Sequence, residues 1–165
     1  MKKILTLIAA ALTTVACGIY SFSGTNIQPD VKSITIPYVE YKALRVNPSL
    51  SNDLTEALQD KFRKLTRLEQ VDVDGDLELV CEVTGYDVKA TAVTAGEFAA
   101  QNRLTITVKV TFTNRKYPED DLEKSFSAYE DYDSNNSLDA VEAGLCETIV
   151  EKLVEDIFNA TVAQW

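Results

Sequence analysis

Few residues in this chain could do chemistry, and histidine is not among them. The sequence contains 3 cysteines, 26 acidic residues and no histidine. Without an imidazole there is no His-based triad, no imidazole metal ligand and no ordinary general acid or base titrating near neutral pH. We also find no glycine-rich phosphate loop and no activated nucleophile. The sequence therefore predicts a binding protein with no cofactor, rather than an enzyme.

Cys17 follows an apolar leader. A short basic start (MKK) precedes an apolar run over 4–12 (ILTLIAAAL), and the small Ala16 lies directly before Cys17. The run is well short of the roughly 20 residues that a transmembrane helix needs, so we predict a cleaved secretory signal over 1–16. A cysteine at this point is typical of bacterial lipoproteins, so we predict that Cys17 carries a diacylglycerol and an acyl group such as palmitate.

The alternative for Cys17 is an ordinary signal peptide followed by a chance cysteine, because Thr14 stands where lipoprotein leaders usually have leucine. Charge cannot replace the lipid as an anchor: 16 Lys and Arg face 26 Asp and Glu, for a net charge of −10. An acidic chain of this kind is repelled by nucleic acid and by anionic lipid. We therefore expect a lipidated tether over 17–30 and a single domain over 31–165.

Hydrophobic periodicity predicts an α+β domain. Apolar residues alternate with polar ones in the predicted strands and recur every three or four residues in the predicted helices. The strands lie near 33–36, 77–88, 104–112 and 125–129, and the helices span 50–65 and 138–158. This order, strand, helix, three strands, helix, predicts two helices on one face of a four-stranded, mostly antiparallel or mixed sheet.

Local signals refine the elements. Asn47 and Pro48 are typical of an N-cap and a first helical residue. Gly85 is expected to shift the strand register, and the two central strands should form a hairpin. Cys81 lies on the predicted apolar face of the sheet, and Cys146 lies on the helix predicted to cover it. A disulfide between them is geometrically possible, and so are two small buried apolar side chains.

Acidic stretches raise the question of calcium. A DVDGD stretch fails as a calcium loop because Leu77 replaces the glycine of the sharp turn. The segment from Asp131 to Glu142 has closer spacing, although Asn136 replaces the glycine there. We interpret it as a helix N-terminus capped by Ser137 or Asn136, with weak calcium binding as the alternative, and predict no metal site.

A basic cluster ends the first predicted helix. It consists of Lys61, Arg63, Lys64 and Arg67. Cations at a helix C-terminus are stabilised by the helix dipole, which favours a structural role for the cluster. An anion-binding patch is the alternative.

Five segments together resemble the LptE family of lipopolysaccharide-assembly lipoproteins, in the form found in Bacteroidetes. They are CGIYSFSGTNIQPDVKSITI, NPSLSNDLTEALQDKFRKLTRL, DGDLELVCEVTGYDV, NRLTITVKVTF and EDIFNATVAQW. The resemblance implies the fold predicted above. It also implies a lipid-anchored protein on the periplasmic face of the outer membrane, which plugs the LptD β-barrel, helps it fold and assists lipopolysaccharide delivery to the outer leaflet. A polar strand face would suit the wet lumen of such a barrel.

The chain departs from the family where basic residues contact lipopolysaccharide. The predicted hairpin tip over 92–97 reads AVTAGE, and the start of the last helix is acidic. Contacts to phosphate need cations, so the candidates here are Lys61, Lys64, Arg67 and Arg103. The alternative function is a free-standing, periplasm-facing lipoprotein that binds another envelope protein or a glycan.

Overall fold

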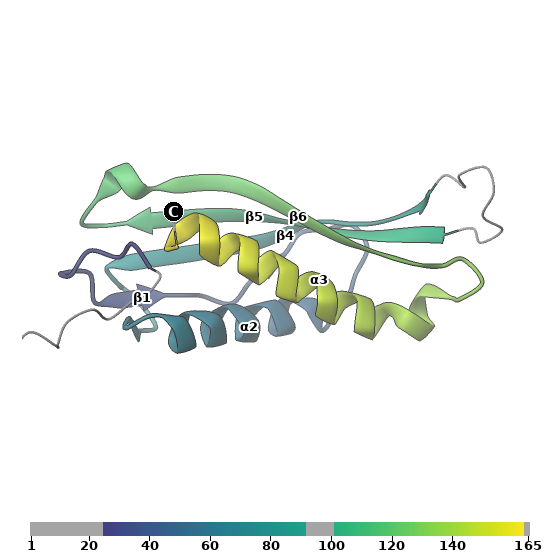
Figure 1. The fold of residues 1–165 in the computed structure, drawn as a ribbon, viewed down its shortest axis with the longest axis horizontal. Helices are drawn as coiled ribbons and strands as arrows, with labels where there is room; N and C mark the ends of the chain where they lie inside the picture. Colours follow the sequence, from purple (N-terminus) through teal and green to yellow (C-terminus); the bar gives the residue numbers. More distant parts are fainter. Residues whose placement is uncertain (1–24, 92–100, 164–165) are drawn as a thin grey trace, which may run out of the picture.

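One mixed sheet with two helices on a single face makes up the domain (Figure 1). The computed structural model describes residues 25–91 and 101–163. The elements are β1 (Ser33–Thr35), β2 (Glu40–Tyr41), α2 (Leu50–Leu65), β3 (Glu69–Gln70), β4 (Leu77–Thr91), β5 (Gln101–Asn114), η2 (Pro118–Asp120), β6 (Leu122–Asp133) and α3 (Leu138–Thr161). The predicted α+β class is confirmed.

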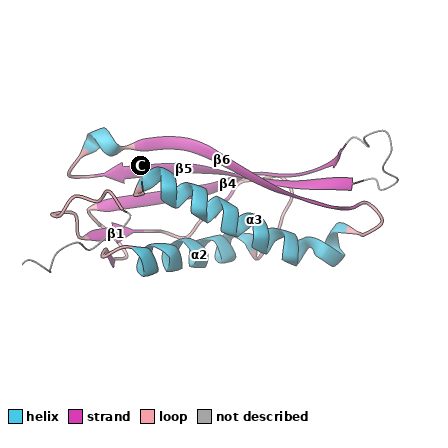
Figure 2. Ribbon diagram, in the orientation of Figure 1, coloured by secondary structure: helices cyan, strands magenta, loops and turns pink. Residues whose placement is uncertain are grey.

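The sheet has six strands in the described residues, rather than the four that the sequence predicts. The additional strands, β2 and β3, are two residues long, which is too short for an alternating pattern to be visible in the sequence. The strand order is β3-β1-β4-β5-β6, and β2 pairs with β4 beyond the end of β1. Strands β1 and β4 are parallel and joined through α2, whereas β4, β5 and β6 form an antiparallel meander (Figure 2).

The central hairpin forms as predicted. Its inner face is fully buried along β5, where the apolar residues are Leu104, Ile106, Val108, Val110 and Phe112. The register of β4 against β5 shifts between Val83 and Gly85, which confirms the predicted role of Gly85. A Cβ at Gly85 would lie 3.0 Å from the Cβ of Thr107, so a larger residue here would be in tight contact with Thr107.

Helix α2 has the predicted bounds, but its cap differs from the prediction. The N-cap position belongs to Ser49, whose side chain makes no capping bond. Asn47 still caps the helix from two residues earlier, because its Oδ1 accepts hydrogen bonds from the backbone N–H groups of Ser49 and Leu50 at 3.1 and 3.3 Å. A turn at Pro48 therefore separates the capping side chain from the first helical turn.

The helices close the core by packing against each other and against the sheet. Leu50, Leu54, Leu58 and Phe62 of α2 are fully buried, whereas Leu65, predicted to share that stripe, is 47% exposed. Phe62 meets Phe158 of α3 edge to face, with ring centroids 5.1 Å apart. Aromatic pairs of this geometry add about 0.5–1.5 kcal/mol beyond the area that they bury.

The first described residues are held at the end of the domain that carries η2 and the C-terminus of α3. The backbone N–H of Asn26 donates to the carbonyl of Val162 at 2.7 Å, and Gln28 Nε2 donates to Asp120 at 2.7 Å. Tyr117 donates its hydroxyl hydrogen to Asp30 at 2.9 Å. The chain therefore enters the domain at the end opposite the β4–β5 hairpin (Figure 1).

Candidate functional site

The face of the sheet that the helices leave uncovered is polar. Outward side chains from β4, β5 and β6 stand side by side because the strands are in register, for example Glu82 beside Lys109 and Lys109 beside Ser125. These positions are half-buried on β5 and mostly exposed on β6, whereas the inner positions between them on β5 are buried. Strict alternation along β5 thus gives one apolar face and one wettable face.

Several charges on this uncovered face are paired. Lys109 lies 2.7 Å from Glu123, and the contact raises the pKa of Lys109 and lowers that of Glu123. Lys42 donates to Glu82 and lies 3.0 Å from Glu40, which raises the lysine pKa. The face can therefore contact a polar surface without presenting a large excess of one charge.

Arg103 lies at the hairpin end of the same face. Its Nε and Nη2 donate to the two carboxylate oxygens of Asp131 at 2.7 and 2.8 Å, and its guanidinium carbon lies 3.7 Å from the ring centroid of Tyr129. The hydrogen bonds from Arg103 lower the pKa of Asp131. This bidentate and stacked geometry fixes the guanidinium in place.

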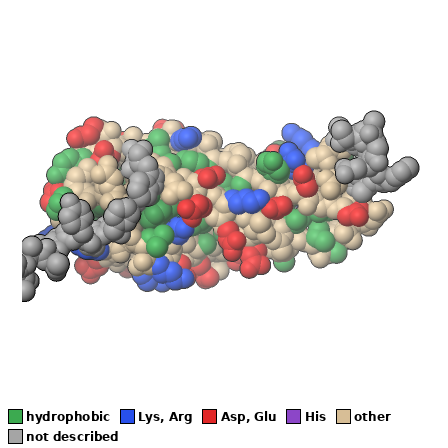
Figure 3. Space-filling view, in the orientation of Figure 1, with side chains coloured by type: hydrophobic (Ala, Val, Ile, Leu, Met, Phe, Trp, Pro, Cys, Tyr) green, Lys and Arg blue, Asp and Glu red, His purple; other side chains and the backbone are tan. Residues whose placement is uncertain are grey.

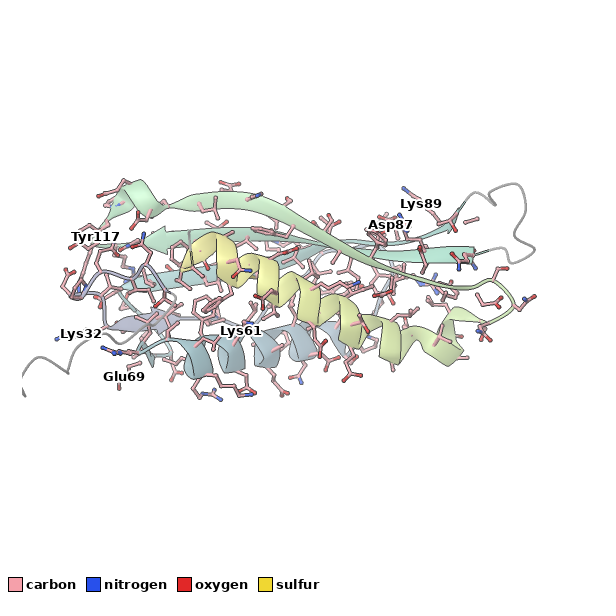
Figure 4. The ribbon with its side chains drawn as sticks, viewed as in Figure 1. Lys32, Lys61, Glu69, Asp87, Lys89 and Tyr117 are labelled. Atoms are coloured by element: carbon pink, nitrogen blue, oxygen red, sulfur yellow. The ribbon has the colours of Figure 1, made fainter. Side chains whose placement is uncertain are left out.

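The predicted basic cluster lies elsewhere and is largely neutralised. Lys61 bridges α2 to Glu155 of α3, which lowers the pKa of that carboxyl, and it lies 5.6 Å from the ring centroid of Phe158. Lys64 lies 3.6 Å from Asp60, and Arg67 follows the helix on the exposed surface. Arg103 lies opposite Lys89 in the strand register of the hairpin, and Lys89 is far from Lys61 along the molecule (Figure 4). The four candidates thus do not form one site.

Acidic and basic side chains are both present on the helix-covered side as well (Figure 3). The structure brings no three or more His, Cys, Asp or Glu side chains into a metal-binding group within residues 25–91 and 101–163. Asp131 and Glu142, the ends of the calcium-like segment, bond instead to Arg103 and to the hydroxyl of Tyr86. The segment itself runs from strand β6 into α3, whose N-cap is Ser137.

Cys81 and Cys146 are both buried free thiols, so of the two alternatives the structure has the small buried side chains. Burial raises the pKa of Cys81 to about 12. Cys146 contacts Asn47 Nδ2 at 3.5 Å and the hydroxyl of Tyr86 at 3.7 Å, and its own pKa is raised by burial. Cys17 and the predicted hairpin tip at 92–97 lie outside the described residues.

A groove between β6 and α3 is a feature that sequence reasoning missed. It encloses about 620 Å³ and is lined by residues Ser127, Ala128, Tyr129, Glu130, Asp131, Glu151, Lys152, Glu155 and Asp156. The sequence predicts both elements, but only the strand order shows that β6 is an edge strand beside the helix.

In the described residues neither helix contains an apolar stretch long enough to span a membrane.

Comparison with protein families gives a match over most of the domain. The family model described as "LptE: Lipopolysaccharide-assembly" matches residues 31–161. No curated protein matches the sequence significantly.

Two solved structures share the fold, and a third is less similar. A hypothetical protein from Chlamydia trachomatis is 10% identical, with 76% of this chain and 93% of that one covered and a TM-score of 0.54. A putative neuraminyllactose-binding hemagglutinin homolog from Helicobacter pylori is 11% identical, with 84% and 87% covered and a TM-score of 0.52. A minor lipoprotein from Acinetobacter baumannii is 16% identical, with 77% and 89% covered and a TM-score of 0.49. Identities this low show similarity of fold alone.

Proposed function

The chain belongs to the LptE lipopolysaccharide-assembly family, and on this premise we propose that it is a non-catalytic outer-membrane lipoprotein that plugs an LptD-type β-barrel. In this role it would help the barrel to fold and assist the transport of lipopolysaccharide to the outer leaflet. The observation that carries the proposal is the family match over residues 31–161, which includes both helices and every strand.

The uncovered sheet face supports a position inside a barrel. Lumens of outer-membrane barrels are lined with polar residues and water, and lipid-facing surfaces are apolar. Thr105, Thr107 and Thr111 line the face with hydroxyl groups, and the hydroxyls of Thr107 and Ser127 lie 2.8 Å apart. Such a surface can replace its hydrogen bonds to water with hydrogen bonds to a polar lumen, and the net change in free energy is small.

The tether supports attachment at the periplasmic face. Acyl chains on Cys17 would hold the protein on the membrane, since two or three chains bind durably where one does not. Asn26 is bonded to the end of α3, so the segment 18–25 spans at most about 30 Å between the lipid and the domain. The end with η2 would then lie near the inner leaflet, at the periplasmic opening of the barrel.

Direct contact with lipopolysaccharide is a separate part of the proposal. Lys61, Lys64 and Arg67 lie at the end of α2, and Arg103 lies on the sheet. Lys61 and Arg103 already contact carboxylates, so a phosphate would have to compete with Glu155 and Asp131. We expect a K61E/K64E/R67E variant to lose affinity for purified lipopolysaccharide; unchanged binding would remove this patch from consideration.

Affinity capture tests the barrel role. The tagged, lipidated protein is isolated from detergent-solubilised outer membranes, washed stringently and analysed by mass spectrometry. We expect a stoichiometric LptD-type barrel. A T105R/T111R variant, which changes the uncovered face, should lose the barrel, whereas N52R/E147R, which adds the same residues on the exposed helix surface, should retain it. Recovery without a barrel, or with another envelope protein in its place, would support the free-standing lipoprotein instead.

A further inference from the structure

We propose that the outer edge of β6, together with the groove beside α3, is a docking site for an extended basic segment of a partner protein. The segment would add to the sheet as a further strand. This inference goes beyond the barrel role and does not depend on it.

The edge is long and regular. β6 is the last strand of the sheet and has 12 residues. Its register with β5 runs unbroken from Asp133, opposite Gln101, to Leu122, opposite Phe112. An edge without proline or a bulge presents a row of backbone donors and acceptors to any added strand.

Two side-chain contacts identify the backbone groups that point outward. Thr84 Oγ1 donates to the carbonyl of Thr107 from the β4 side, so the groups of Ser127, opposite Thr107, point away from β5. Lys152 Nζ donates to the carbonyl of Tyr129 at 3.3 Å from the other side of β6. Because the direction alternates along a strand, Ser125, Ser127, Tyr129 and Asp131 present their N–H and C=O groups to the open edge.

The groove gives the added strand a second wall. It is open to solvent and has a volume of about 620 Å³ between residues 127–131 of β6 and residues 151, 152, 155 and 156 of α3. A slot between an edge strand and a helix is the geometry in which extended peptides bind by strand addition, with main-chain hydrogen bonds supplying affinity and side-chain pockets supplying specificity.

Charge selects the kind of segment. The groove is lined by Glu130, Asp131, Glu151, Glu155 and Asp156, against one cation, Lys152. Lys152 bonds to Glu130, while Asp131 and Glu155 have partners outside the groove. Glu151 and Asp156 make no ion pair within the described part of the chain. Lysine or arginine side chains of a partner fit these two carboxylates, whereas the acidic edge of a second copy would be repelled.

Lys152 covers the edge in the free protein. Its ammonium donates a hydrogen bond to the carbonyl of Tyr129, which is an acceptor that an incoming strand needs. This side chain is exposed and held by two contacts at the surface, so a backbone N–H of the partner can replace it.

Peptide binding tests the main-chain part of the proposal. The probe is an acetylated and amidated peptide of alternating lysine and threonine, titrated into the full lipidated chain in a nonionic detergent. Two further peptides carry N-methyl groups on every second amide, in opposite phases. Strand addition uses one set of amides, so one methylated peptide should bind about tenfold or more weakly while the other retains affinity. Equal affinities of the two methylated peptides, or no binding of the parent peptide at millimolar concentration, would overturn the proposal.

Variants locate the site. Ser127→Pro removes an outward N–H, which an edge strand tolerates, and should abolish binding; Ser127→Ala keeps the N–H and should bind normally. An E151K/D156K variant should weaken binding about tenfold or more and reduce its salt dependence, whereas Glu147→Lys on the same helix should have little effect. A peptide with glutamate in place of lysine should not bind. Binding by that peptide, or equal binding by Ser127→Pro and Ser127→Ala, would contradict this site.

Discussion

At the scale of single residues, the partners of the cations decide their role more than the cations themselves. The sequence shows Lys61 and Arg103 as basic residues, but not that Glu155, 94 positions away, and Asp131, 28 positions away, neutralise them. Partners this distant meet only through the packing of α3 on α2 and of β6 on β5. Within the basic cluster at the end of α2, Lys61 thus acts first as a link between the helices.

The pair of Arg103 and Asp131 predicts a pH effect. Arg103 lowers the pKa of Asp131, so the pair stabilises the fold above the ordinary carboxyl pKa and loses this contribution as the pH falls through the lowered value. We expect Arg103→Gln to raise the pKa of Asp131 in an NMR titration and to have little effect on the free energy of unfolding at neutral pH, because both side chains are partly exposed. Lys124→Gln, on the same strand as Asp131, is the control. An unchanged pKa in Arg103→Gln would show that the ion pair is absent in solution.

The buried thiols predict low reactivity. A thiol reacts as its thiolate, and burial raises the pKa of Cys81 to about 12 and also raises that of Cys146. Iodoacetamide at pH 8 should label neither in the native protein and both in guanidinium chloride, as measured by mass spectrometry. Rapid labelling of the native protein, or a Cys81–Cys146 disulfide in the unreduced sample, would contradict the structure.

At the scale of elements, the long strands and both helices follow from periodicity, and irregular features depend on neighbours. Gly85 is visible in the sequence as an interruption of β4. Its cause is visible only in the sheet, where a side chain would meet Thr107. Gly144 also lies inside an element, α3, but a Cβ there would meet nothing within 4 Å.

These two glycines predict opposite effects. Gly85→Val should lower the free energy of unfolding by about 1–3 kcal/mol, because the added atoms overpack the contact with Thr107. Gly144→Ala should raise it by about 0.5–1 kcal/mol, because alanine restricts the unfolded chain and favours the helix. Urea denaturation of both variants and the parent protein measures the difference. A Gly85→Val variant as stable as the parent would mean that the strands separate readily at the register shift.

At the scale of the whole molecule, the two faces of the sheet differ in their surroundings. The helices and the inner face form the core, and the uncovered face remains polar along its length. The chain enters at one end through Asn26, Gln28 and Asp30, so a lipid on Cys17 would be attached at that end. A lipid at this end would set the orientation of the domain relative to the membrane.

Anchoring by Cys17 predicts a change of location without a change of fold. Cys17→Ser should move the protein from the membrane fraction to the soluble periplasmic fraction, because the acyl chains on Cys17 are the proposed anchor. Its urea midpoint should stay the same as that of the parent. Cys81→Ala, which removes a thiol from the core, should remain in the membrane fraction. The experiment uses cells that lack the barrel, and membrane retention of Cys17→Ser there would point to an ordinary signal peptide and another anchor.

The sequence by itself determined the features that repeat along the chain: the helices, the long strands, the hairpin, the register shift at Gly85 and the family resemblance. Periodicity reports which face of an element is apolar, and this is enough to predict the α+β class. The tertiary structure decided what depends on contacts between distant segments. It added β2 and β3, paired Lys61 and Arg103 with carboxylates, left Cys81 and Cys146 as free thiols and set β6 at the edge beside α3. Pairing and edge position are properties of neighbours in space, and a local pattern carries no information about them.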